Sequence, residues 1–119
     1  MIGFCMGGGF AVVLASGHGF EASSVNYGAL PKNSEEILKG ACPVVASYGA
    51  RDRSVGDAPG RLRQILDASG VDNDVKVYPG AGHSFLNNHP GWLATLRGRP
   101  ARMPRCRACS PSSAWWPGR

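Results

Sequence analysis

The glycine-rich segment at residues 3–9 constrains the fold of this chain more than any other feature. It reads Gly3-Phe4-Cys5-Met6-Gly7-Gly8-Gly9 and is followed at once by an apolar run at residues 10–15. Small residues at positions 3, 7 and 8 allow a sharp backbone turn and close packing of the helix that follows. The spacing matches the Gly-x-Ser-x-Gly nucleophile turn with cysteine in place of serine. The segment therefore predicts that Cys5 lies at a helix N-terminus, where free N–H groups and the helix dipole favour a thiolate.

Charge divides the chain into two parts. The formal net charge is +5 over 119 residues. Residues 1–96 carry seven Lys and Arg against eight Asp and Glu, whereas residues 97–119 carry six Arg and no acid. We therefore predict one domain over residues 1–96 and an Arg/Pro-rich tail over residues 97–119 that is disordered or frameshifted. The alternative is a functional tail that touches nucleic acid or a membrane surface.

The apolar segments alternate between strand and helix patterns. No run of 18 apolar residues and no signal sequence is present, so we expect a cytoplasmic protein with no membrane partner. The pattern predicts a parallel sheet of about three to four strands with flanking helices, an α/β fold. Little alternation at residues 43–48 predicts a strand covered on both faces. The expected strands are residues 22–27, 43–48 and 71–78 with the end of another at 1–2, and the expected helices are 6–16, 34–38, 59–68 and one starting near 92.

Three chemically reactive side chains each follow a separate expected strand. Cys5, Asp52 and His83 should therefore meet at the carboxyl edge of the parallel sheet. A thiol nucleophile needs a base that takes its proton and an acid that orients that base, and these residues supply all three roles. Their order along the chain, nucleophile then acid then imidazole, is that of α/β-hydrolases.

Four motifs occur in an informative order and spacing. They are Gly3-Phe4-Cys5-Met6-Gly7-Gly8, Val25-Asn26-Tyr27-Gly28, Tyr48-Gly49-Ala50-Arg51-Asp52 and Tyr78-Pro79-Gly80-Ala81-Gly82-His83-Ser84-Phe85. Together they resemble consecutive motifs of the dienelactone hydrolase family over roughly residues 1–90. The resemblance implies an α/β-hydrolase fold and a Cys5-Asp52-His83 triad that opens small-molecule esters or lactones through an acyl-enzyme, without a cofactor. It also implies that the backbone N–H of Met6 lies in the oxyanion hole.

The chain also departs from the pattern of that family. Family members have further strands and helices before the nucleophile, which supply a second oxyanion donor and part of the substrate pocket. The dienelactone-specific members resemble one another in a basic residue four positions after the catalytic histidine, where this chain has Asn87. We therefore expect a partial α/β-hydrolase fold, truncated at its N-terminus. The substrate within the ester and lactone class and the oligomeric state stay open.

Other interpretations compete with the triad. Asp57 is a rival acid and His18 and His89 are rival imidazoles, while Cys42 is expected in the core away from the site. The chain could be an inactive fragment that aggregates or pairs with a partner through an unpaired strand edge. A phosphate-binding loop fits poorly, because no Gly-Lys-Ser or Gly-Lys-Thr follows the glycines. Cys106-x-x-Cys109 is half of a zinc site without a second pair of ligands, so we expect no metal.

Overall fold

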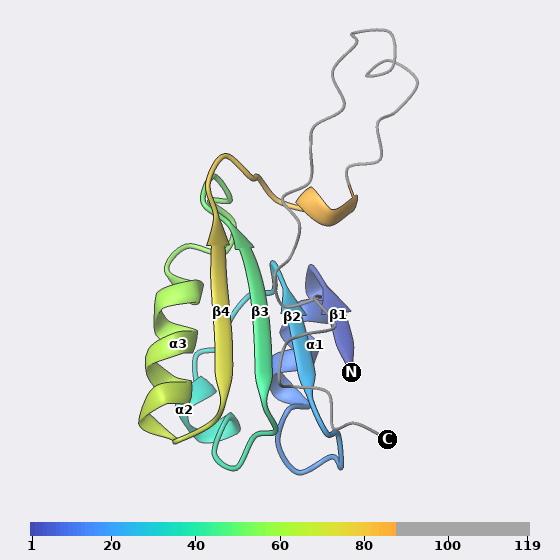
Figure 1. The fold of residues 1–119 in the computed structure, drawn as a ribbon, viewed down its shortest axis with the longest axis vertical. Helices are drawn as coiled ribbons and strands as arrows, with labels where there is room; N and C mark the ends of the chain where they lie inside the picture. Colours follow the sequence, from blue (N-terminus) through green and yellow to red (C-terminus); the bar gives the residue numbers. More distant parts are fainter. Residues whose placement is uncertain (88–119) are drawn as a thin grey trace, which may run out of the picture. The chain divides into compact units, whose positions relative to one another are not determined.

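The computed structural model describes residues 1–87, and these form a four-stranded parallel sheet with flanking helices (Figure 1). The strands lie in the order β1-β2-β3-β4, and every neighbouring pair is parallel. The predicted alternation of strand and helix is confirmed. The elements are β1 (Ile2–Phe4), α1 (Met6–Val13), β2 (Ser23–Asn26), α2 (Ser34–Ile37), β3 (Val44–Gly49), α3 (Ala58–Ala68), β4 (Asn73–Tyr78) and the 3-10 helix η1 (Phe85–Asn87). The predicted tail at residues 97–119 and the helix near residue 92 lie outside the described residues.

The helices form one layer against the sheet. Helix α1 packs on β1 and β2, α3 packs on β4, and the short α2 contacts both of the other helices. In α3 the buried residues Leu62, Ile65 and Leu66 recur at helical spacing, which confirms the predicted amphipathic helix. Gly70 follows with a φ of +66°, a left-handed conformation that suits glycine where a helix ends.

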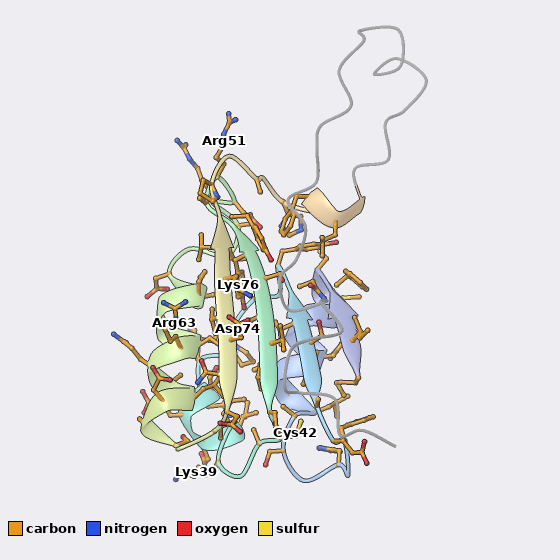
Figure 2. All side chains as sticks on the ribbon, viewed as in Figure 1. Lys39, Cys42, Arg51, Arg63, Asp74 and Lys76 are labelled. Atoms are coloured by element: carbon orange, nitrogen blue, oxygen red, sulfur yellow. The ribbon has the colours of Figure 1, made fainter. Side chains whose placement is uncertain are left out.

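Strand β3 is covered less completely than its sequence predicts. Val44, Ala46 and Tyr48 are buried, but Val45 between them is 36% exposed. The prediction of a strand buried on both faces is therefore wrong within residues 1–87, because the described helices cover the sheet as a single layer. Asp74 and Lys76, both on β4 and labelled in Figure 2, form an ion pair in which Oδ2 and Nζ lie 2.7 Å apart.

Two element boundaries also differ from the prediction. Strand β1 extends through Phe4, instead of ending at Ile2, and pairs with β2 along its whole length. Helix α1 ends at Val13 and not near Ser16. The reason is that Ser16 forms an isolated bridge with Ala41, which draws the chain away from the helix axis towards the start of β3.

Cys42 lies where the sequence places it. It precedes β3 and is half-buried against the hydrophobic core. Figure 2 shows Cys42 and Arg51 at opposite ends of the sheet. Cys42 is therefore remote from the carboxyl edge, where the candidate site forms.

Candidate active site

The turn between β1 and α1 holds Cys5 in an unusual backbone conformation. Its φ of +53° and ψ of −117° fall in a region that residues other than glycine rarely adopt, at a cost of roughly 1–3 kcal/mol. The turn tolerates this strain because glycine stands at position 3. A Cβ atom there would lie only 1.9 Å from the carbonyl oxygen of Gly7. The predicted tight turn that opens a helix is present, with Cys5 exposed between β1 and α1.

Strand β2 fixes the turn from the side. The backbone N–H of Cys5 donates to the carbonyl oxygen of Asn26 at 3.0 Å, and the Asn26 side-chain amide donates to the Gly3 carbonyl oxygen at 3.2 Å. Glycines also allow the start of α1 to approach the end of β2. A Cβ atom on Gly28 would lie 2.3 Å from the carbonyl carbon of Gly8. Asn26 is therefore a structural support that the sequence interpretation missed, although a polar residue at the end of a buried strand was a usable signal.

Gly7 does not have the packing role expected from the sequence. A Cβ atom at Gly7 would meet no neighbouring heavy atom within 4 Å. At Gly8, in contrast, a Cβ atom would lie 2.7 Å from the Asn26 carbonyl oxygen. Close packing in this turn therefore requires glycine at positions 3 and 8, and the expectation for position 7 is wrong.

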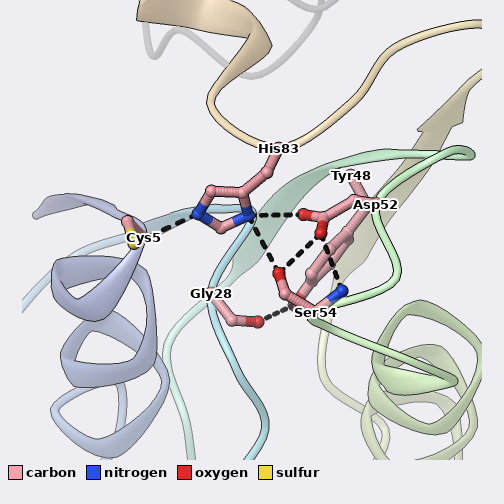
Figure 3. A network of polar contacts seen from close by, with 6 residues as sticks. All are labelled: Cys5, Gly28, Tyr48, Asp52, Ser54 and His83. Atoms are coloured by element: carbon pink, nitrogen blue, oxygen red, sulfur yellow. Dashed lines mark hydrogen bonds and ion pairs between the residues drawn. The ribbon is translucent and has the colours of Figure 1, made fainter.

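The side chains of Cys5, His83 and Asp52 lie in a continuous row (Figure 3). Nε2 of His83 lies 3.2 Å from Sγ of Cys5, and Nδ1 of the same ring lies 2.6 Å from Oδ2 of Asp52. The three residues follow β1, β4 and β3, so the parallel sheet brings them to one edge. The geometry gives the thiol an imidazole partner and gives the imidazole a carboxylate partner.

Ser54 is a fourth member of this row that the sequence interpretation missed. Its hydroxyl lies 2.5 Å from Oδ1 of Asp52, and its backbone N–H donates to the same oxygen at 3.0 Å. The hydroxyl also lies 3.0 Å from Nδ1 of His83 (Figure 3). The spacing Asp52-Arg53-Ser54 was a usable signal, because an aspartate side chain often accepts a hydrogen bond from the backbone two residues on.

Hydrogen bonding favours an ion pair between Cys5 and His83. The hydrogen bond with His83, assisted by the backbone N–H of Met6, lowers the pKa of the Cys5 thiol below its ordinary 9.0. The hydrogen bonds with Cys5 and then with Asp52 raise the pKa of His83 above its ordinary 6.5. Both shifts widen the pH range in which a thiolate faces an imidazolium.

Asp52 is the buried end of the row. Burial acts to raise the pKa of its carboxyl, but the hydrogen bonds from Ser54 and His83 outweigh burial and hold the pKa below its ordinary value. The Asp52 side chain is only 1% exposed, whereas the His83 side chain is 37% exposed. Asp52 is thus kept ionised and fixed in place beneath the imidazole.

The rival residues lie elsewhere or outside the described part of the chain. Asp57 is the N-terminal flanking residue of α3 and makes no side-chain capping bond there. Nδ1 of His18 lies 2.5 Å from the carbonyl oxygen of Ser16. His89 lies outside the described residues, as do Cys106 and Cys109. Within residues 1–87 no group of three or more His, Cys, Asp or Glu side chains could hold a metal, and no helix is long and apolar enough to cross a membrane.

Tyr27 forms one wall of the site. Its ring contacts that of His83 edge-on, with the ring centres 5.2 Å apart, and it also contacts the rings of Phe4 and Phe85. Its hydroxyl is buried without a hydrogen-bond partner among residues 1–87. Burial, followed by the charge of Cys5, raises the pKa of this hydroxyl, so Tyr27 stays a neutral donor.

The parallel sheet, the strained cysteine turn and the row of Cys5, His83 and Asp52 define a chain of the α/β-hydrolase class. Solved structures share this fold. A crystal structure from Klebsiella pneumoniae subsp. pneumoniae MGH 78578, described as that of a dienelactone hydrolase candidate, is similar with a TM-score of 0.63 and 33% identity. The match covers 71% of this chain and 40% of that one.

Sequence comparison identifies the family. The sequence model of the dienelactone hydrolase family matches residues 1–101, and the chain belongs to this family. A Saccharolobus solfataricus protein, named as a carboxymethylenebutenolidase candidate, is 34% identical over 87 residues, which are 73% of this chain and 34% of that protein. The carboxymethylenebutenolidase of Rhodococcus opacus is 30% identical, over 79% of this chain and 43% of its own. The chain therefore spans less than half the length of these relatives.

Proposed function

We propose that this chain carries the catalytic centre of a hydrolase that cleaves carboxylic ester or lactone bonds through an acyl-enzyme on Cys5. The observation that supports this proposal is the uninterrupted row from Sγ of Cys5 through the His83 ring to Asp52, with distances of 3.2 Å and 2.6 Å. A thiolate at a strained turn, paired with an imidazole that a carboxylate orients, is the arrangement that nucleophilic acyl transfer requires. The names of the relatives, carboxymethylenebutenolidases, point to the same class of bond.

The acylation step uses the ion pair. The Cys5 thiolate attacks the acyl carbon, a C–S bond forms, and the carbonyl electron pair moves onto oxygen. The backbone N–H of Met6, which helps to lower the pKa of the Cys5 thiol, is the donor available to that oxyanion. When the carbonyl reforms, the C–O bond to the alcohol breaks, and His83 donates its Nε2 proton to the departing oxygen.

Deacylation reverses the direction of proton transfer. His83, now neutral, takes a proton from water as the water oxygen attacks the thioester carbon. The C–S bond then breaks, and the thiolate returns opposite an imidazolium. Asp52 holds the Nδ1 side of the ring throughout, so that Nε2 keeps facing Sγ. No metal or cofactor enters these steps.

Hydrolysis of p-nitrophenyl acetate tests the proposal. The Cys5→Ala variant should lose turnover by at least about 10³-fold, because it removes the thiol that lies against Nε2 of His83. Cys42→Ala is the matched control, since Cys42 is half-buried at the far end of the sheet, and it should keep its turnover. Brief acid quenching should leave one acetyl group on the peptide that contains Cys5. Equal turnover by Cys5→Ala and the unmodified chain would refute the proposal.

A second candidate role is pairing with a partner chain. Strand β1 is an edge of the sheet within residues 1–87, and its residues Ile2 and Phe4 are 70% and 46% exposed. An exposed apolar edge strand favours pairing with another strand. Size-exclusion chromatography distinguishes the two roles. An Ile2→Lys change, at the more exposed position of β1, that dissolves an assembly and leaves ester turnover intact would favour pairing as a separate property.

A further inference from the structure

A cavity opens directly at the nucleophile. It has a volume of about 590 Å³, within the size range of small-molecule sites, and both Cys5 and His83 line it. Its other walls come from α1, from residues 29–31 after β2, and from Ser54 and Val55 after β3. Because Sγ of Cys5 lies in its wall, a group bonded to Sγ would begin inside this cavity.

One face of α1 supplies an apolar wall. Met6, Phe10 and Val13 all line the cavity and lie on one side of the helix, at the spacing i, i+4, i+7. Their exposed fractions are 75%, 57% and 37%, which is unusual for large apolar residues of a helix that packs on a sheet. The face opposite the core is thus apolar where it borders the nucleophile.

The loops after β2 and β3 add further apolar side chains to the wall. Leu30, Pro31 and Val55 face the cavity from the two loops. Among residues 1–87, those that line it include no Asp, Glu, Lys or Arg. Lys32 and Arg53 adjoin lining residues in the sequence but are exposed and do not line the cavity.

These walls select between classes of acyl chain. A carboxylate placed among apolar groups loses its hydration, which is strongly unfavourable. The one cationic group that lines the cavity within residues 1–87 is the His83 imidazolium, and it already faces Cys5 and Asp52. A methylene group placed there gains from burial, by about fourfold in binding for each one fully buried. The cavity therefore discriminates by charge first and by chain length second.

We propose that the catalytic centre accepts esters whose acyl chain is neutral and apolar, with that chain held between α1 and the loops after β2 and β3. This inference rests on the proposed hydrolase function. Apart from His83, which is already paired with Cys5 and Asp52, the cavity wall within residues 1–87 offers an acidic group no ion-pair partner.

A matched pair of substrates tests the inference. The acyl chain of p-nitrophenyl valerate ends in a methyl group, whereas that of mono-p-nitrophenyl glutarate ends in a carboxylate. Hydrolysis of p-nitrophenyl acetate measures the basal turnover. After correction for spontaneous hydrolysis, kcat/KM for valerate should exceed that for glutarate by at least about tenfold. Equal values, or a preference for glutarate, would overturn the inference while acetate turnover left the proposed function standing.

Alkylation of Cys5 gives a second readout that does not need turnover. N-pentyliodoacetamide and 5-(iodoacetamido)pentanoate form another pair of neutral and anionic chains. Peptide mapping separates Cys5 from the other thiols, and the neutral reagent should label Cys5 at least about fivefold faster. If acetate is not hydrolysed, the proposed function fails, and the alkylation ratio still decides whether the cavity prefers neutral chains.

A single introduced charge tests which wall the acyl chain contacts. Val13→Lys places a cation on the cavity side of α1 at a position that is already 37% exposed, so the fold should tolerate it. The neutral-to-anionic ratio should fall by about tenfold. Val77→Lys on β4, 46% exposed and outside the cavity, is the matched control and should leave the ratio unchanged. An unchanged ratio in Val13→Lys would show that the acyl chain does not lie against α1.

Discussion

The two loops that supply the ends of the proposed triad are built in opposite ways. The turn after β1 presents Cys5 exposed and in a rare backbone conformation, with φ at +53°. The loop after β3 buries Asp52, which accepts hydrogen bonds from the backbone N–H and hydroxyl of Ser54 and lies 2.6 Å from His83. The turn that holds Cys5 is strained and exposed to solvent. The loop that holds Asp52 is buried, and the Asp52 carboxylate is hydrogen-bonded.

This difference fits the roles proposed for the two side chains. A nucleophile must reach an acyl carbon, so Cys5 has to project from the fold, and the backbone adopts strain to project it. An orienting acid never meets the substrate, so Asp52 gains from burial as long as hydrogen bonds compensate for lost hydration. His83, with a side chain 37% exposed, lies between these two environments and couples them.

The largest expected effect comes from removing the space that the strained turn needs. In Gly3→Ala the new Cβ atom would lie 1.9 Å from a backbone oxygen, so the turn cannot form unchanged. We expect a loss of at least about 3 kcal/mol in the free energy of unfolding, measured by urea denaturation, together with the loss of ester turnover. Gly7→Ala in the first turn of α1 meets open space, and because alanine favours the helix more than glycine does, it should be neutral or stabilise the fold by up to about 1 kcal/mol. Equal losses in the two variants would contradict the packing described for the turn.

The next effect comes from neutralising the buried acid. Asp52→Asn should lower kcat/KM by about 10³- to 10⁴-fold, because an amide can stabilise the wrong tautomer of His83. Asp57→Asn is the matched control, since Asp57 is the rival acid and lies at the start of α3. Similar losses in both variants would remove Asp52 from the orienting role.

A smaller effect should come from Ser54, which supports the acid. Ser54→Ala removes a hydroxyl donor to Asp52 and should lower kcat/KM by about tenfold, the usual effect of one hydrogen bond to a charged group. The hydrogen bond from Ser54 helps to hold the pKa of Asp52 low, so its loss raises that pKa. Activity should therefore begin to fall at a higher pH as the solution is acidified.

Ser54→Thr keeps the hydroxyl and should restore the unmodified pH profile. A change in rate without any movement of the acidic limb would indicate that Ser54 acts only in packing. The low pKa of Asp52 in its buried loop would then need a cause other than the hydrogen bond from Ser54.

The sequence predicted those parts of the site that depend on strand order. Cys5, Asp52 and His83 each follow a strand, so parallel topology alone brings them to one edge. The sequence could not predict Ser54 as a partner of both Asp52 and His83, because that contact depends on how the loops after β3 and β4 meet in space. Nor could the sequence distinguish the packing of Gly7 from that of Gly8, because both are glycines in one run. They differ in the structure because the end of β2 lies close to Gly8 and not to Gly7.

The exposed face of the sheet shows another limit of sequence patterns. Val44-Val45-Ala46 reads as a continuous buried run, yet Val45 is 36% exposed among residues 1–87. An apolar residue in the sequence indicates that burial would be favourable there. It does not indicate that a helix or strand actually packs over that side chain. The end of α1 was misplaced for a related reason, since the bridge between Ser16 and Ala41 is a tertiary contact without a local signal.

The pH dependence of Cys5 alkylation tests the central claim, that His83 and Cys5 share an ion pair, most directly. The rate of iodoacetamide addition to Cys5, followed by peptide mapping, measures the thiolate fraction without requiring turnover. In the unmodified chain the rate should rise with a midpoint below the ordinary thiol pKa of 9.0, because His83 and the Met6 N–H lower the pKa of Cys5. In His83→Gln the midpoint should move up towards 9.0. The same midpoint in both proteins would contradict the pairing of Cys5 with His83 and, with it, the proposed triad.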